Sequence, residues 1–498
     1  MIYKKIFFLC ILMISNMGYS QETVLFASDA FVNAKLGVSV AATNDIFIVG
    51  AWNGNQNITL GGAVYVFKKN GAVWIEEAKL IPSDPSSQQE FALHSIAING
   101  DYILVGAYNY LGLEDDQKGA AYVFKKEDDQ WLEQAKLTPT DRKEKDAFGR
   151  SVVLFQDYAI IGAQCHPVNG IGCSGAAYIF KREGDEWIEQ KKLIPSDPVL
   201  DAFFGNAVSM NEDFAFVSAP NAKNNGIASG AVYVFKKDGQ DWIEETKLFS
   251  SDIPSNNTDF GYSIDVQAET VLIGTGVGEM YNGYERGTAY VYTYNGFNWI
   301  EESRLVPTDL AEEDKEGRDV SLFGNQALIS LNGDHNTGRI YLFEKEGNEW
   351  QQKNTIVSSN VSNYDQYGSD VALSEDYIFT GAFNNSSSGM AGAGAAYVYE
   401  LDLIPTSIEV ASLETSIQVY PNPINNFLTV LLKSGVLNET SNLKIYDING
   451  RLISVYPNPT KNGTDNLWEV NTMFYPSGTY ILQVKGPDQI YTSKFVKM

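Results

Sequence analysis

Cysteine and histidine are scarce in this chain. Only three of each occur among 498 residues, which excludes a disulfide-rich scaffold and leaves few ligands for zinc or thiol chemistry. Basic residues are also few, because 36 lysines and arginines stand against 62 aspartates and glutamates, for a formal net charge of -26. A chain of this charge repels phosphate backbones, so nucleic acid is not expected as a partner.

Long apolar runs are missing as well. The longest candidate, Ile6–Ile14, is shorter than the roughly 20 residues that a membrane-spanning helix needs. It follows Lys4 and Lys5 and precedes the small residue Ser20, which is the layout of a secretory signal. We therefore expect a signal peptide over residues 1–20, export of the protein, and no transmembrane segment.

The chain contains a sevenfold repeat, which is the strongest signal in the sequence. A Gly-x-x-Tyr phrase recurs every 51 to 57 residues, with its tyrosine at Tyr65, Tyr122, Tyr178, Tyr233, Tyr290, Tyr341 and Tyr397. A Phe-Gly-x-Ser-Val phrase and a Trp-Ile-Glu-Glu phrase recur in step with it. Each repeat holds four runs rich in β-branched and aromatic residues, and turns such as Asn70-Gly71 favour hairpins between the last two.

Four antiparallel strands per repeat predict an all-β fold, a seven-bladed β-propeller, with an open β-solenoid as the rival arrangement. The seventh repeat ends at Tyr399 and lacks its fourth strand. The N-terminal segment Val24–Asp29 aligns with Lys79–Asp84, which belongs to a fourth strand and the turn after it. We therefore expect the N-terminal segment to complete the seventh blade.

Residues 22–402 resemble the FG-GAP repeat family, the seven-bladed propeller also found in integrin alpha chains. The resemblance is carried by Phe148-Gly149-x-Ser151-Val152, Ile161-Gly162-Ala163 and Gly175-x-x-Tyr178. Family members that bind calcium have an Asp-x-Asp-x-Asp-Gly loop between the first two strands. Here that connection is a tight turn such as Asn44-Asp45, too short to wrap the six or more oxygens that calcium takes. No metal and no cofactor is therefore expected.

The repeat stops after Asp402. Residues 403–415 are predicted to form a linker and residues 416–498 a small β-sandwich. This module resembles the C-terminal sorting domain of the type IX secretion system, through Tyr420-Pro-Asn-Pro423, Gly450-Arg451 and Gly478-x-Tyr480; an unrelated fibronectin-like appendage is the alternative. The resemblance implies that the secretion machinery is a partner. It also implies a Gram-negative protein that passes through the periplasm and is secreted or attached to the outer surface.

The sequence offers no catalytic constellation. The histidines His94, His166 and His335 lie in separate repeats, and no phrase indicates a nucleophile beside a base, so no catalytic residue is assigned. Cys165 and Cys173 flank one loop of the third repeat. A local disulfide is favoured over a metal site, which needs more ligands than His166 alone.

Three acidic residues are expected near the propeller axis. Asp319 and Asp370 occupy a position that is serine in most repeats, and Asp265 lies two residues further along in repeat five. They are interpreted as channel carboxylates that face water or bond to neighbouring backbone. The alternative is a cation site or an acid and base pair.

The loops between the second and third strands differ most among the repeats. Their aromatic side chains are the ligand-binding candidates: Trp52, Tyr108, Tyr110, Tyr281, Tyr284 and Phe383. The leading hypothesis is a non-enzymatic, secreted or surface-displayed protein that binds or adheres to an extracellular protein or glycan through one propeller face. A carbohydrate-active enzyme that uses Asp319 and Asp370 is the second hypothesis, and a purely structural surface component is the third.

Overall fold

The computed structural model describes residues 22–58, 60–86, 90–108, 119–251, 259–276, 288–308, 317–331, 338–358, 360–401, 417–420, 427–432, 442–447, 452–457, 460–462, 465–476, 478–485 and 490–497. All regular elements in these residues are β-strands. The expected signal peptide and the expected linker lie outside the described residues. The chain divides into two compact units, one ending at Ile404 and the other containing the strands that follow it.

The first unit contains seven four-stranded antiparallel sheets, which are the blades. Blades 1 to 3 are formed by β2 (Leu36–Ala42), β3 (Ile46–Ala51), β4 (Ala63–Asn70) and β5 (Val73–Leu80); by β6 (Phe91–Asn99), β7 (Tyr102–Ala107), β8 (Ala120–Glu127) and β9 (Gln130–Leu137); and by β10 (Phe148–Phe155), β11 (Tyr158–Ala163), β12 (Ala176–Glu183) and β13 (Glu186–Leu193).

Blades 4 to 6 follow the same order. They are formed by β14 (Val208–Met210), β15 (Phe214–Ala219), β18 (Ala231–Asp238) and β19 (Asp241–Leu248); by β20 (Phe260–Gln267), β21 (Thr270–Thr275), β22 (Ala289–Tyr294) and β23 (Trp299–Leu305); and by β24 (Gly317–Phe323), β25 (Gln326–Leu331), β26 (Arg339–Glu346) and β27 (Glu349–Ile356). A small hairpin, β16 (Lys223–Asn224) and β17 (Ile227–Ala228), lies in the connection between β15 and β18.

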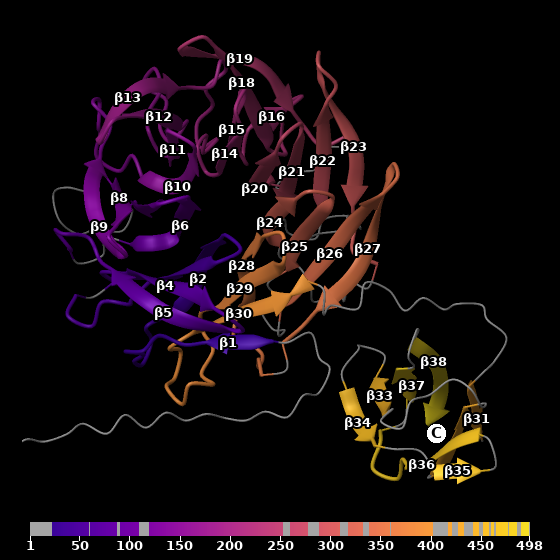
Figure 1. Cartoon of the computed structure of the whole chain (residues 1–498). Coiled ribbons are helices and arrows are strands. Elements are labelled where there is room, and N and C mark those ends of the chain that lie inside the picture. Colours follow the sequence, from indigo (N-terminus) through magenta and orange to yellow (C-terminus); the bar gives the residue numbers. More distant parts are fainter. Residues whose placement is uncertain are drawn as a thin grey trace, which may run out of the picture. The chain divides into compact units, whose positions relative to one another are not determined.

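The seven blades form a closed ring. The first strand of each blade contacts the first strand of the next, and β2 of blade 1 contacts β28 (Tyr367–Leu373) of blade 7. Figure 1 shows these first strands around the central axis and the fourth strands at the rim. The propeller prediction is therefore confirmed.

The seventh blade takes its outermost strand from the N-terminal part of the chain, as predicted. Its strand order is β1 (Thr23–Leu25), β30 (Ala395–Glu400), β29 (Tyr377–Ala382) and β28. Val24 pairs with Tyr397, and the Glu22 carboxylate accepts hydrogen bonds from Ser358 at 3.0 Å and Tyr399 at 3.3 Å. This pairing covers an edge that β30 would otherwise expose.

The glycine of the Phe-Gly phrase is required by the close approach of neighbouring blades. Gly149 has a φ of +93°, and a Cβ atom there would lie 2.4 Å from the carbonyl oxygen of Ala120 in the preceding blade. Any larger residue would therefore strain the backbone and push two blades apart. The tight packing explains why this phrase recurs around the ring.

The other repeated phrases also hold the blades together. After β5, the Ser83 backbone N–H and hydroxyl both donate to Glu133 of blade 2, and Asp84 accepts from Tyr122 at 2.8 Å and Lys136 at 2.6 Å. The repeated tryptophans pack across blade boundaries in the same way, as Trp74 of blade 1 does on blade 7. These residues are architecture, since they recur in several blades.

The second unit is a small β-sandwich, as predicted. One sheet has the order β31 (Ile417–Tyr420), β32 (Phe427–Leu432), β36 (Asp465–Asn471) and β35 (Thr460–Asn462), and the other has the order β34 (Leu452–Tyr456), β33 (Leu443–Asp447), β37 (Gly478–Lys485) and β38 (Ile490–Lys497). Leu428 and Trp468 of the first sheet share a core with Ile445 and Leu482 of the second. No helix in the described part of the chain is long and apolar enough to cross a membrane.

Candidate ligand-binding face

The residue that follows the second strand of a blade lies where the variable loop begins. Trp52, Tyr108 and Phe383 occupy this equivalent position after β3, β7 and β29, directly after Ala51, Ala107 and Ala382. Because blades 7, 1 and 2 are consecutive in the ring, the three residues lie along an arc on one side of the axis. All three are half-buried. The other aromatic candidates, Tyr110, Tyr281 and Tyr284, lie outside the described residues.

Tyr108 has a cationic neighbour. The guanidinium of Arg150, at the start of β10 in blade 3, lies over its ring at 5.7 Å from the centroid. Burial raises the pKa of Tyr108 to about 12, and the charge of Arg150 opposes this shift. Glu90 and Tyr262 are close enough to act on the same phenol. Tyr108 is therefore a neutral, half-buried phenol with the Arg150 guanidinium over its ring.

A second cation bonds to the residue that follows Phe383. The Lys35 ammonium, which precedes β2, donates a hydrogen bond to the amide oxygen of Asn384. Its backbone N–H donates to Gly392, and burial lowers its pKa. The backbone N–H of Asn53, which follows Trp52, donates to the carbonyl of Ala34 at 3.1 Å. The segment Ala34–Lys35 is therefore bonded both to the residue after Trp52 and to the residue after Phe383.

Sequence reasoning missed both cations. Arg150 fills the variable position of the Phe-Gly-x-Ser phrase, which in the six other blades is Val38, His94, Asn206, Tyr262, Arg318 and Ser369. Since this position varies more from blade to blade than the positions on either side of it, its variation is the available signal. Lys35 lies two residues before the glycine of the same phrase, where Asp259 stands in blade 5.

The channel carboxylates each bond to backbone of the next blade. Asp370 accepts from Val40 at 2.7 Å and Asp319 accepts from Val371 at 3.1 Å. Asp265 accepts from Leu322 at 2.7 Å. The three side chains therefore cap free N–H groups on the inner strands, and they keep neighbouring blades in register.

Asp319 and Asp370 also bond to each other. Burial raises the pKa of both carboxyl groups, and the negative charge of Asp319 raises that of Asp370 further. Two adjacent carboxyl groups cannot both ionise, so the pair shares a proton that Asp370 holds. Burial also raises the pKa of Asp265, to about 7. Glycosidases need a gap of about 5 Å or more between their two carboxyl groups, and a directly bonded pair leaves no such gap.

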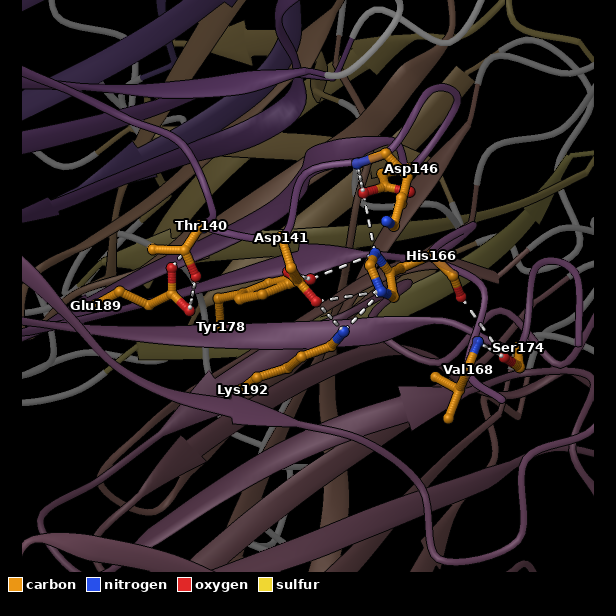
Figure 2. A network of polar contacts seen from close by, with 10 residues as sticks. Thr140, Asp141, Asp146, His166, Val168, Ser174, Tyr178, Glu189 and Lys192 are labelled. Carbon is orange, nitrogen blue, oxygen red and sulfur yellow. Dashed lines mark hydrogen bonds and ion pairs between the residues drawn. The ribbon is translucent and has the colours of Figure 1, made fainter. Parts of the chain in front are cut away.

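His166 is the centre of a buried polar network in blade 3 (Figure 2). Its Nδ1 lies 2.9 Å from the fully buried carboxylate of Asp146, and its Nε2 lies 2.6 Å from the Lys192 ammonium. Since an ammonium can only donate, Nε2 accepts and Nδ1–H donates to Asp146. Burial opposes the ionisation of Asp141, but hydrogen bonds from Lys192 and Tyr178 lower its pKa.

This network anchors the connection between β11 and β12. Cys165 and Cys173 form a disulfide within that connection, and the hydroxyl of the buried Ser174 accepts from the backbone N–H of Val168 at 2.9 Å. Blade 7 has the matching contact, from Asn385 to Asp365 at 2.8 Å. His166 therefore reinforces a position that another blade also uses.

The turns between the first and second strands are short in every blade. The Thr43 hydroxyl accepts from the backbone of Ile46 at 3.1 Å, and Asn211 accepts from Phe214 at 2.8 Å. In the described part of the chain, no three His, Cys, Asp or Glu side chains gather closely enough to hold a metal ion. His94 is half-buried in β6, and His335 lies outside the described residues.

A seven-bladed ring of this repeat defines the class of the protein, and comparison with known families identifies the family. The FG-GAP repeat matches seven times, at residues 19–67, 74–124, 131–180, 187–235, 242–292, 299–343 and 350–399. The chain belongs to the FG-GAP repeat family. The secretion system C-terminal sorting domain matches residues 418–498. The protein is therefore a secreted or surface-attached β-propeller protein of a Gram-negative bacterium, and its sorting domain interacts with the type IX secretion machinery.

The solved structures that the chain matches are distant. A putative 6-phosphogluconolactonase from Bacteroides uniformis has a TM-score of 0.48 at 8% identity, covering 86% of this chain and 100% of its own. Sqt1 from Saccharomyces cerevisiae has a TM-score of 0.43 at 10% identity, covering 95% and 97%. A chain of the mitotic checkpoint complex has a TM-score of 0.46 at 10% identity, covering 79% and 99%. No curated protein matches the sequence.

Proposed function

We propose that the propeller is a non-enzymatic binding module that captures an extracellular glycan or protein, as in adhesion. The observation that carries the proposal is the arc of Trp52, Tyr108 and Phe383 at one equivalent position of three consecutive blades. Half-buried aromatic rings offer large contact area with little loss of side-chain freedom, which suits a binding surface. The repeated residues of the ring would then serve as a rigid support for this arc.

We also propose an export pathway for the protein. An N-terminal signal over residues 1–20 would take the chain across the inner membrane into the periplasm. The sorting domain, proposed to comprise residues 416–498, would then direct it across the outer membrane. The propeller, proposed to comprise residues 22–402, is the part displayed to the ligand.

The test is a binding array of glycans and extracellular matrix proteins, probed with the purified protein. Trp52→Ala and Tyr108→Ala should each weaken binding of the captured ligand by at least about tenfold. Phe297→Ala is the matched control, because Phe297 is 83% exposed and lies in the hairpin between β22 and β23, away from the variable loops. Equal loss in all three variants would contradict the assignment of the site.

The array also separates the alternatives. Degradation of a polysaccharide without stable capture would favour the carbohydrate-active enzyme. Asp319 and Asp370 would then be tested as the acid and base of a lyase, because their direct bond leaves no gap for a glycosidase. Absence of both capture and degradation would favour a structural surface component.

A further inference from the structure

Three lysines on the fourth strands of blades 1 to 3 are neutralised by the connection that enters their blade. Lys79, Lys136 and Lys192 each lie 2.6 Å from an aspartate oxygen of the preceding connection. Lys35 and Arg150 differ, since the described contacts give neither of them a carboxylate partner. The chain has an excess of 26 acidic charges. Two half-buried cations without a carboxylate partner are therefore unexpected in it, and they indicate a site for an external anion.

Both cations belong to the aromatic arc. Lys35 bonds to Asn384, the neighbour of Phe383, and Arg150 covers the ring of Tyr108. A half-buried cation has given up part of its hydration, so an anion placed beside it regains more free energy than it would at an exposed lysine. The arc therefore alternates flat apolar faces with positive charge.

We propose that this arc recognises an anionic polysaccharide whose sugar rings stack on Trp52 and Phe383 and whose carboxylates bind Lys35 and Arg150, the latter placed over the ring of Tyr108. The inference rests on the proposed binding function and narrows its ligand to polymers of uronic acids. Arg150 is suited to the role because its planar guanidinium can donate two parallel hydrogen bonds to one carboxylate.

An acidic peptide fits the arc less well. Extended peptides gain much of their affinity by pairing with a free strand edge. Free backbone N–H groups on the edges of the inner strands are already bonded. The N–H of Val40 donates to Asp370, and the N–H of Val371 donates to Asp319. Nucleic acid carries a denser charge, which the negative field of the whole chain opposes.

The remaining acidic residues do not prevent local binding of an anion. At physiological ionic strength, charges further than about 8 Å from the ligand are largely screened. The nearest cations then decide the interaction, and Lys35 and Arg150 are on the arc itself.

The experiment measures the affinity of the full-length protein for polygalacturonate oligomers and for the same oligomers after reduction of their carboxylates to alcohols. Arg150→Gln and Lys35→Gln should each weaken polygalacturonate binding by about tenfold and leave the reduced oligomer unaffected. Lys236→Gln is the control, because it removes the same charge from an exposed ion pair with Glu245 on the outer part of blade 4. Unchanged melting temperatures would show that the variants are folded.

Three other outcomes would contradict the proposal, each at a different point. Equal affinity for the native and the reduced oligomer would overturn charge recognition and leave the glycan-binding function standing. Poly-glutamate that binds as tightly as polygalacturonate would overturn the role of the sugar ring. Failure to bind every glycan and every matrix protein would overturn the proposed function together with this inference.

Discussion

Asp319 and Asp370 show how one side-chain position takes on a different role within a repeat. In blade 1 the equivalent residue, Ser39, donates its hydroxyl to the carbonyl of Ala92 in the next blade, at 2.6 Å. In blades 6 and 7 the aspartates instead accept from backbone N–H groups of the next blade. A hydrogen bond to the backbone of the next blade is kept, but the side chain changes from donor to acceptor. The reversal brings titratable groups into the middle of the ring.

The first prediction concerns Asp265 and pH. Its folded-state pKa of about 7 lies above the ordinary 3.8, so the folded protein keeps a proton that the unfolded chain releases. Stability should therefore fall as pH rises from about 4 to 7. Asp265→Asn keeps an acceptor for Leu322 and should regain about 1–2 kcal/mol at pH 8, allowing for solvent screening at a half-buried group. Urea denaturation at pH 5 and pH 8 measures this.

The exposed Asp238→Asn is the control for that comparison, since it makes the same chemical change at a hairpin. Asp319 and Asp370 shift in the same direction, so some loss of stability toward pH 8 should persist in the Asp265 variant. If the wild-type protein and the Asp265 variant lose equal stability between the two pH values, the protonation of Asp265 in the folded state is wrong.

At the scale of elements, β1 is the strand that holds the ring closed. A chain that begins at Asp29 lacks β1, the buried Leu25 and the contacts of Glu22. We expect its melting temperature to be lower by at least about 5 °C, because an edge strand and an apolar contact are lost together. Differential scanning calorimetry measures this, with a chain that begins at Glu22 as the control. Equal melting of the two chains would show that β1 does not lock the ring.

The turns between first and second strands lead to a prediction about calcium. They hold two or three residues, and Thr43 and Asn211 already use their side-chain oxygens on backbone N–H groups. Such turns cannot supply the six or more oxygens that calcium takes. The melting temperature should therefore be the same in 5 mM EDTA as in 5 mM calcium chloride, within about 1 °C. A clear rise in calcium would reveal a site elsewhere in the chain.

The strands could be predicted from the sequence because their phrases repeat in every blade. The candidate site was hard to predict because its residues do not repeat. Three phrases in register located the four strands of each blade, and the orphan segment at Val24 revealed the closure. The position of Arg150 has no fixed residue type in the repeat. Its contact with Tyr108 joins blade 3 to blade 2, and a contact between blades cannot be read from the repeat. Lys35 and the bonded pair of Asp319 and Asp370 likewise depend on contacts between separate blades.

At the scale of the whole molecule, the two compact units have separate cores. A chain that ends at Asp402 keeps every blade, so its propeller should melt within about 2 °C of the full-length protein. In the native host the same deletion should leave the protein inside the cell envelope, because the sorting domain is gone. Calorimetry and surface proteolysis of whole cells provide the two measurements. A truncated protein that still reached the surface would show that export does not need the module.

The pairing of β1 with β30 also determines when the propeller can be completed. Residues 23–25 are made long before their partners, residues 396–398, and six whole blades are synthesised in between. The first strand therefore has no partner for almost the entire time that the ribosome spends on the repeats. Contacts between such distant parts of a chain are the slowest to form in folding. A partly synthesised chain cannot close the ring, however many blades it already contains.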